Sequence, residues 1–174
     1  FISTLEPRKN VPTLLDAYAQ IAKRTDAPLI IGGGKGWLYD EIFAKDEQLN
    51  LGDRVRFVGY VPGEDLPLWY AAATVFTMPS LYEGFGMPLL EAMCCGTPVI
   101  TTTSSSLPEV VGDAGITVPP TDATALGEAI LRVLNDADLR AEMRERGFRQ
   151  AQRFSWRTTA EQTLQAYRDA AAGR

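Results

Sequence analysis

The fold of this chain is decided by residues 75–101, VFTMPSLYEGFGMPLLEAMCCGTPVIT. Two short apolar runs bounded by polar residues, Val75–Met78 and Pro98–Thr101, are typical of buried strands. The segment 88–95 between them has the composition of a helix and starts with a proline, which suits a first helical turn. A strand, a helix and a second strand in this order form the unit from which parallel sheets are built. The stretch therefore predicts an α/β fold.

The same alternation continues on both sides of this stretch. Further strand-like runs lie at Leu29–Ile31, Val55–Val58 and Ile116–Val118, and the chain starts on another at Phe1. Helices are expected between the runs, over residues 11–24, 37–49, 65–72 and 107–111. After residue 121 the pattern contains helices only, and the last is expected from Thr158 to Ala171. We therefore expect one α/β domain over residues 1–174, with a Rossmann-like open parallel sheet, helices on both faces and an all-helical C-terminal stretch.

Composition excludes several classes of protein. The chain has 174 residues, of which 45% are hydrophobic and 22% charged, as in ordinary globular domains. Its net charge of -5 argues against a general nucleic-acid binder, and the absence of histidine removes the commonest general base and zinc ligand. Cys94 and Cys95 lie in an apolar helical stretch, where we expect a buried and inert thiol pair in a reducing compartment, which favours a cytoplasmic protein.

A pair of glutamates frames the loop before the helix at 88–95. Glu83 belongs to the loop, and Glu91 is expected in the first turn of a helix that begins near Pro88. Carboxylates placed there stay ionised and accept hydrogen bonds, which suits sugar hydroxyls better than proton donation. The amides of Gly84, Phe85, Gly86 and Met87 can reach the same pocket. The alternative is structural, with Glu91 stabilising the helix start and Glu83 exposed.

A basic pair follows the first strand. Arg8 and Lys9 lie in a loop at the carboxyl end of the predicted sheet, where ligands of this fold bind. Two cations there can neutralise a diphosphate. The alternative is a solvated basic turn at a helix start. Because the helix macrodipole disfavours cations at that end, we expect an anion beside them.

A glycine-rich run, Gly32–Gly36, follows the strand at 29–31. A Walker loop would need Ser or Thr where Gly36 stands, and a dinucleotide fingerprint would need a glycine where Leu38 and Tyr39 stand. Two interpretations remain. The run either approaches a phosphate or sugar closely, or it makes a tight turn between a strand and a helix.

In order and spacing, the motifs of the chain resemble the C-terminal donor-binding domain of GT-B glycosyltransferases, and specifically the retaining enzymes of glycosyltransferase family 4. The resemblance covers nearly the whole chain. Its motifs are Glu6–Asn10, Ile30–Gly34, Val55–Val61, Pro79–Gly86, Glu91–Met93, Gly96–Ile100, Pro108–Gly115 and Phe154–Trp156.

The resemblance assigns roles to residues of this chain. It implies that Glu83 is the catalytic carboxylate beside the donor sugar, that Glu91 binds the ribose, and that Lys9 binds the diphosphate. The family's arginine after the first strand is replaced here by Ser3–Thr4, so either Arg8 substitutes for it or one phosphate contact is absent. The base is expected near the loop of Gly59, Tyr60 and Val61. The full set of expected donor-binding residues is Arg8, Lys9, Gly33, Gly34, Tyr60, Glu83, Gly84, Phe85, Gly86, Met87, Pro88, Leu89 and Glu91.

The resemblance also implies an activity. Such enzymes move a hexose from a GDP- or UDP-linked donor to a glycan or lipid-linked acceptor with retention, and generally require neither metal nor cofactor. The Glu6–Asn10 variant resembles enzymes of surface-polysaccharide assembly, which often transfer mannose. We expect the chain to be cytoplasmic, or peripheral to the inner face of the membrane in the full-length protein.

An N-terminal acceptor domain is expected to precede Phe1, so this chain alone should bind donor and transfer little or nothing. In intact relatives the terminal helix packs on that domain. In this chain its apolar side is expected to be exposed and to pair two copies.

Two other functions stay open. A nucleotide-sugar epimerase would use the same diphosphate and ribose contacts, but would need further acid and base groups near the sugar. A noncatalytic module would bind nucleotide or protein through a degenerate site. The intact pair of Glu83 and Glu91, together with Lys9, argues against degeneration.

Overall fold

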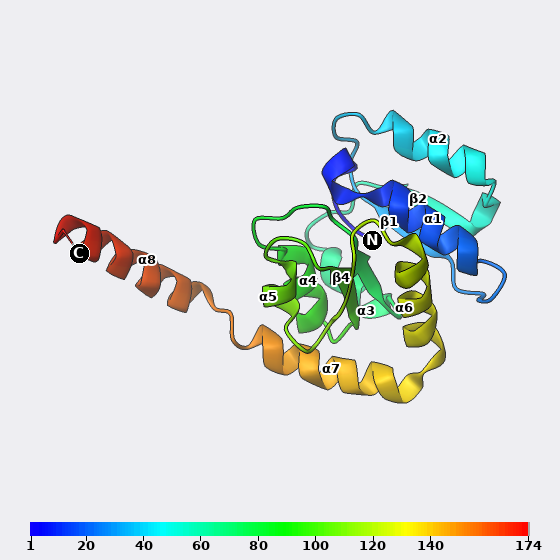
Figure 1. The fold of residues 1–174 in the computed structure, drawn as a ribbon. Helices are drawn as coiled ribbons and strands as arrows, with labels where there is room; N and C mark the ends of the chain where they lie inside the picture. The colour runs from blue at the N-terminus through cyan, green and yellow to red at the C-terminus, as the bar shows by residue number, and fades with distance from the viewer. Residues whose placement is uncertain (174) are drawn as a thin grey trace.

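The computed structural model describes residues 1–173 and has the α/β architecture that the sequence predicts (Figure 1). Its strands all pair in parallel. They form a two-stranded sheet of order β1-β2 and a three-stranded sheet of order β3-β4-β5. The strands are β1 (Leu29–Gly32), β2 (Val55–Gly59), β3 (Phe76–Met78), β4 (Val99–Thr102) and β5 (Ile116–Val118). Each predicted strand from residue 29 onward is confirmed within one residue at either end.

The first segment of the chain differs from the expected strand. Ile2 and Leu5 make isolated parallel bridges to Gly32 and Lys35, so the segment lies along β1 without forming a regular strand. No ladder joins it to β3 within residues 1–173, and the expected single sheet is therefore divided. The loops that follow the two elements are nevertheless joined, because the Leu81 amide donates to the carbonyl of Arg8 at 2.9 Å. In doubly wound folds, ligands bind at such a point, where the order of the strands reverses.

The helices occupy the positions that the sequence indicates, with small shifts at their ends. The segment expected over 11–24 ends at Ile21, and the one expected over 37–49 begins at Asp40. The helices are α1 (Val11–Ile21), α2 (Asp40–Leu49), α3 (Leu66–Ala72), α4 (Met87–Cys94), α5 (Leu107–Val111), α6 (Ala123–Asn135), α7 (Ala137–Ala151) and α8 (Trp156–Ala171), with 3-10 turns η1 (Pro7–Lys9) and η2 (Gly52–Arg54).

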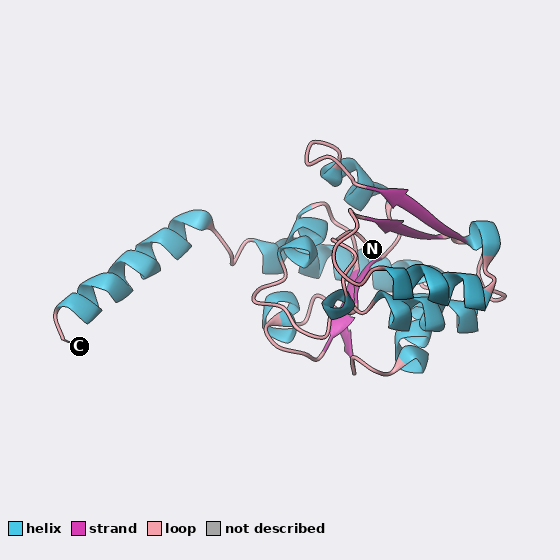
Figure 2. Cartoon of the chain, turned by 90° about the horizontal axis from the view of Figure 1, so that it is seen from above, coloured by secondary structure: helices cyan, strands magenta, loops and turns pink. Residues whose placement is uncertain are grey.

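Two apolar clusters confirm that helices cover both faces of the strands (Figure 2). Successive side chains of a strand point to opposite faces, and β4 follows this rule. Ile100 belongs to the cluster that contains the buried sides of α1 and α6. Val99 belongs to the other cluster, which contains the buried sides of α4 and α5. Both side chains are fully buried, so β4 is the strand that the two clusters share.

Helices α1 and α6 pack closely although they are far apart in the sequence. A Cβ atom added at Gly127 would lie 3.0 Å from the carbonyl oxygen of Ala17, so a larger residue would push the two backbones apart. Polar contacts at the edge fix the pairing: Arg24 forms an ion pair with Glu128, and the Thr124 hydroxyl donates to Gln20 at 3.0 Å. This pairing covers one face of the strands.

The last helix, α8, extends away from the rest of the molecule (Figure 1). None of its residues is buried, and Trp156, Leu164 and Tyr167 are exposed. An isolated helix of this length is only marginally stable in water, so its apolar stripe needs a surface to pack on. No helix within residues 1–173 is long and apolar enough to cross a membrane.

Candidate functional site

The loops after the first segment and after β3 place three predicted site residues together. The Glu83 carboxylate accepts a hydrogen bond from Lys9 Nζ at 2.6 Å through one oxygen, and from Arg8 Nη1 at 2.6 Å through the other. The Ser80 hydroxyl donates to Glu83 at 2.8 Å. Glu83 is 9% exposed and Lys9 is 7% exposed. These contacts make a charge cluster in which Lys9, Glu83 and Ser80 are buried and Arg8 is partly exposed, and which we call the Glu83 cluster.

The electrostatics of the Glu83 cluster keep its carboxylate ionised. Burial by itself raises the pKa of the Glu83 carboxyl, but the hydrogen bonds from Lys9, Ser80 and Arg8 outweigh it and lower that pKa below its ordinary value. The anion expected beside the basic pair is thus Glu83 of the same chain, aided by Glu6, whose carboxylate lies 2.6 Å from Arg8. The alternative in which Glu83 is exposed is wrong.

Two serines hold the loop that follows Glu83. The Ser105 hydroxyl accepts from the Glu83 amide at 2.9 Å, and the Ser106 hydroxyl donates to the carbonyls of Glu83 and Phe85 at 3.0 Å each. Gly86 has a φ of 108°, and a Cβ there would lie 2.9 Å from Leu107, so only glycine fits. Within the described residues, no hydrogen-bond acceptor is recorded for the amides from Gly84 to Met87. Those amides are available to a ligand.

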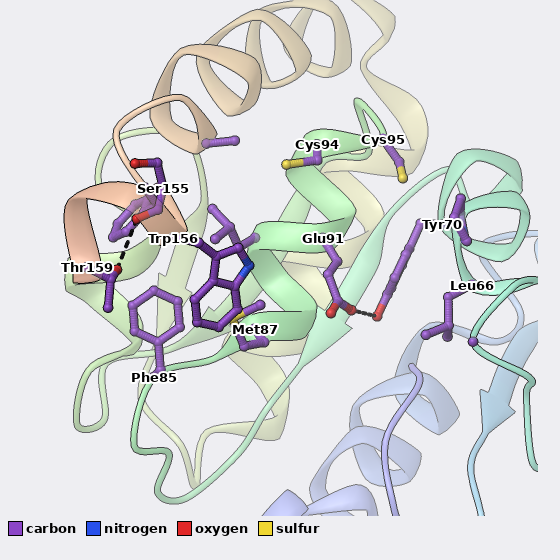
Figure 3. Close-up of a pocket in the computed structure, with 15 residues that line it drawn as sticks. Leu66, Tyr70, Phe85, Met87, Glu91, Cys94, Cys95, Ser155, Trp156 and Thr159 are labelled. Carbon is purple, nitrogen blue, oxygen red and sulfur yellow. Dashed lines mark hydrogen bonds between the residues drawn. The ribbon is translucent and has the colours of Figure 1, made fainter. Parts of the chain in front are cut away.

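The second predicted acid, Glu91, lies in a separate groove of about 780 Å³ (Figure 3). It is on α4, which begins at Met87, but its expected place in the first turn is wrong because that turn contains no acid. Tyr70 donates to Glu91 at 2.9 Å. The groove runs along α4 between α3 and the start of α8, and is lined by Gly63, Leu66, Pro67, Tyr70, Phe85, Met87, Leu90, Glu91, Cys94, Cys95, Ala151, Phe154, Ser155, Trp156 and Thr159.

The predicted site therefore has two parts joined by residues 83–91. Phe85, Met87 and Glu91 line the groove, whereas Arg8, Lys9 and Glu83 do not belong to its lining. Pro88 stands at the start of α4. Leu89 offers the site neither its side chain, which is fully buried, nor its amide, which donates to Gly86 at 3.0 Å. Leu89 packs in the apolar core together with Ala92 and Met93 of the same helix.

The glycine-rich loop is positioned by packing. Gly33 has a φ of 144°, and a Cβ there would lie 1.8 Å from the carbonyl oxygen of Ser3, so this position requires glycine for the turn itself. A Cβ at Gly34 would meet open space. The Gly33 amide donates to Gly59 at 2.7 Å, which places this loop beside the one that carries Tyr60. Tyr60 is 76% exposed and does not line the groove.

The cysteine pair differs from expectation. Cys94 is exposed and Cys95 is partly exposed, and both line the groove, so the predicted buried pair is wrong. The reason is the register of α4, which turns its inner side, with Leu89, Ala92 and Met93, toward the core. Burial is the largest cause that raises the pKa of the Cys95 thiol above its ordinary value, and the neighbouring Cys94 and Glu91 raise this pKa further.

Sequence reasoning missed the residues that support the two acids. Tyr70 carries no signal of its own, because an aromatic residue in a short amphipathic helix is usually part of a core. Ser80 belongs to the motif Pro79–Gly86, but the motif assigns it no function. Ser105 and Ser106 belong to a run of serines, which is a signal for a loop rich in hydroxyl groups. Within residues 1–173, no group of three or more acidic or cysteine side chains is arranged to hold a metal ion.

The family model described as "Glycosyl transferases group 1" matches residues 1–150. The O-antigen chain mannosyltransferase B of Escherichia coli is 46% identical over 170 residues, which cover 97% of this chain and 45% of that protein. The present chain thus spans less than half the length of this curated relative.

Solved structures share the fold over nearly the whole chain. The sucrose-phosphate synthase of Thermosynechococcus elongatus superposes with a TM-score of 0.86 at 36% identity, covering 99% of this chain and 45% of that one. The HepE protein of Anabaena, solved with UDP and glucose, superposes with a TM-score of 0.85 at 28% identity, covering 95% of this chain and 46% of that one. The chain therefore covers less than half of each of these two proteins.

Proposed function

Because the chain belongs to the glycosyl transferases group 1 family and has the C-terminal half of the GT-B fold, we propose that it is the donor-binding domain of a retaining glycosyltransferase. Its reaction moves a hexose, mannose in our proposal, from a nucleoside-diphosphate donor to a glycan or lipid-linked acceptor. The observation that carries this proposal is the convergence of Lys9 and Arg8 on the loop of Glu83, beside free amides and next to the groove of Glu91.

The Glu83 cluster is suited to a diphosphate leaving group. Lys9 provides positive charge in a buried setting, where electrostatic interactions are stronger than in water, and the partly exposed Arg8 adds a second cation beside it. The amides from Gly84 to Met87 and the N-terminus of α4 provide further donors for anionic or hydroxyl oxygens. Such preorganised groups stabilise the charge that develops as the sugar leaves, so this mechanism requires no metal and no cofactor. Glu83 stays ionised and accepts hydrogen bonds from the sugar.

The groove of Glu91 is suited to the nucleoside. The Glu91 carboxylate accepts hydrogen bonds from ribose hydroxyls, and the loop of Tyr60 lies near the base. Mannose is supported by the name of the Escherichia coli relative, a mannosyltransferase of O-antigen chains, which also supports a role in polysaccharide assembly. The donor is GDP- or UDP-linked in this proposal, and UDP is supported by the HepE structure, which was solved with UDP and glucose.

The groups that bind the acceptor lie, in our proposal, in an N-terminal domain outside this sequence. The chain spans 45% of its Escherichia coli relative, which leaves room for such a domain. Without it the chain binds donor and transfers little or nothing. We place the complete enzyme in the cytoplasm, peripheral to the inner face of the membrane, where a lipid-linked acceptor would be within reach.

Isothermal titration of the chain with UDP, GDP and their glucose and mannose conjugates tests the proposed donor site. We expect one diphosphate to bind, and the Glu91→Ala variant to weaken its binding by at least about tenfold, because a charged acceptor of hydrogen bonds is lost. Glu109→Ala, a change of an exposed acid on α5, is the matched control and should leave the affinity unchanged. Absence of binding by the unaltered chain contradicts the proposal, and conversion of the donor sugar to its epimer would favour the epimerase instead.

Helix α8 leads to a prediction about assembly. We propose that α8 docks on the acceptor domain in the longer protein, and that two copies of the present chain pair through its exposed stripe. Leu164→Glu should convert a dimer to a monomer in light scattering, because it places a charge on that stripe. Gln162→Glu adds the same charge elsewhere on the exposed helix and should leave the dimer intact. A strict monomer of the unaltered chain at high concentration contradicts the pairing.

A further inference from the structure

Tyr70 is a buried residue that contacts a proposed ligand-binding acid. It lies on α3 and is 2% exposed, and its hydroxyl donates to Glu91 Oε2 at 2.9 Å (Figure 3). Within the described residues, no hydrogen bond is recorded to the other oxygen, Oε1. Glu91 therefore has one oxygen fixed by the protein and one available in the groove.

The position of Tyr70 is itself fixed from two directions. Its ring and that of Phe76 form a T-shaped pair, with 5.1 Å between centroids and an interplanar angle of 89°. The buried hydroxyl of Thr97 donates to the carbonyl oxygen of Tyr70 at 2.6 Å. A side chain held by ring packing and by its own backbone loses little freedom when it makes a further hydrogen bond, so the bond to Glu91 is preorganised.

The chemistry of the pair fixes the direction of its hydrogen bond. Burial raises the pKa of the Tyr70 phenol well above its ordinary value, and the charge of Glu91 raises it further. The phenol therefore keeps its proton at every physiological pH and acts as the donor, while the carboxylate acts as the acceptor.

We propose that Tyr70 is a positioning residue for ribose recognition: by holding Oε2 of Glu91, it directs Oε1 to the hydroxyls of the ribose. This inference rests on the proposed function, in which Glu91 binds the ribose. Tyr70 does not touch the ligand in this arrangement. Its effect is confined to the part of the affinity that comes from the ribose hydroxyls, and it leaves the diphosphate contacts of Lys9 and Arg8 unchanged.

The test compares nucleotides with and without ribose hydroxyls. The affinity of the chain for UDP or GDP, whichever binds more tightly, is measured beside that for the 2′,3′-dideoxy form, and the ratio of the two gives the ribose preference. Tyr70→Phe keeps the ring and its packing, and we expect it to lower this preference by about tenfold, as for loss of a hydrogen bond to a charged group. Binding of the dideoxy nucleotide should be unchanged.

Tyr18→Phe is the matched control. Tyr18 is 3% exposed, and its hydroxyl donates to the carbonyl of Ala27 at 2.7 Å in the other apolar cluster. The same buried hydroxyl is removed, but no proposed ligand group is affected, so the ribose preference should stay at the value of the unaltered chain. Thermal unfolding of both variants measures the general cost of losing the hydroxyl.

The possible outcomes separate this inference from the proposed function. A ribose preference in the unaltered chain that persists in Tyr70→Phe overturns the positioning role alone. A loss of affinity in Tyr70→Phe that is equal for both nucleotides also overturns it, because it indicates a structural role. An unaltered chain that binds no nucleotide refutes the proposed function and this inference with it.

Discussion

Replacement of Lys9 by methionine should lower the affinity for a nucleoside diphosphate by about 100-fold or more. The reason is that the buried Lys9 ammonium and a phosphate of the ligand form a strong and poorly screened charge pair, which the change removes. Lys9 is 7% exposed, and its ammonium lies 2.6 Å from Glu83. Methionine has a similar length and no charge, so the packing of the stem is kept. Titration calorimetry with UDP and GDP measures the loss, while the binding of uridine and guanosine, which have no phosphate, should change little.

Two further variants distinguish a lost phosphate contact from a damaged fold. Lys45 lies away from the site and forms an ion pair with Asp16 at 2.7 Å. Lys45→Met removes the same charge as Lys9→Met and should leave nucleotide binding intact. The double variant Lys9→Met/Glu83→Gln removes the carboxylate that the first change leaves with less compensation, so it should recover stability. If its diphosphate affinity equals that of Glu83→Gln alone, Lys9 acts only through the fold and its proposed role is wrong.

Replacement of Glu83 by glutamine should change the two parts of donor binding in opposite directions. The carboxylate pairs with both Lys9 and Arg8, so its loss leaves more positive charge for a diphosphate. We expect the nucleoside diphosphate alone to bind about tenfold more tightly, since the repulsion between like charges is removed. The further affinity contributed by the sugar should fall by about tenfold, because a charged acceptor for its hydroxyls is lost. Parallel titrations with the diphosphate and the nucleotide sugar measure both effects.

Glu6→Gln is the matched control for this experiment. Glu6 also forms an ion pair with Arg8 at 2.6 Å, but within the described residues its carboxylate makes no recorded contact with the Lys9 ammonium, and only its backbone carbonyl accepts from the Lys9 amide. It should leave the contribution of the sugar unchanged. Weaker binding of the diphosphate to Glu83→Gln would show that the carboxylate organises the cations more than it competes for them, and would contradict the predicted tightening.

The elements of this fold could be predicted from local patterns, but their pairing could not be predicted fully. Apolar runs such as Pro98–Thr101 identify strands because burial on both faces leaves a continuous apolar sequence. The break between the first segment and β3 has no such signature, because the register of strand pairing depends on contacts between distant residues. The prediction that Cys94 is buried is wrong for a similar reason. Cys94 and Leu89 are both apolar residues of α4, and only the packed structure shows that Leu89 faces the core.

The candidate site could also be predicted only in part from the sequence. The residue types at Glu83, Glu91, Arg8 and Lys9 indicated an anion and polyol site, and the structure brings Arg8 and Lys9 to Glu83. Their mutual neutralisation could not be read from positions so far apart in the sequence. The bond from Tyr70 to Glu91 was hidden for a different reason, because it joins a core side chain to the groove.

The packing of α1 on α6 has a consequence for how the chain reaches its fold. The two helices are far apart in the sequence, since α1 ends at Ile21 and α6 begins at Ala123, and α1 gains its buried partner only when α6 has been synthesised. Closing so long a loop costs conformational entropy before the packing contact contributes any stabilising free energy, and this slows folding. A chain that ends before Ala123 leaves Leu14, Leu15 and Tyr18 without part of their cover. The domain therefore cannot bury this face of α1 until α6 is present, and an incomplete chain exposes apolar surface that favours aggregation.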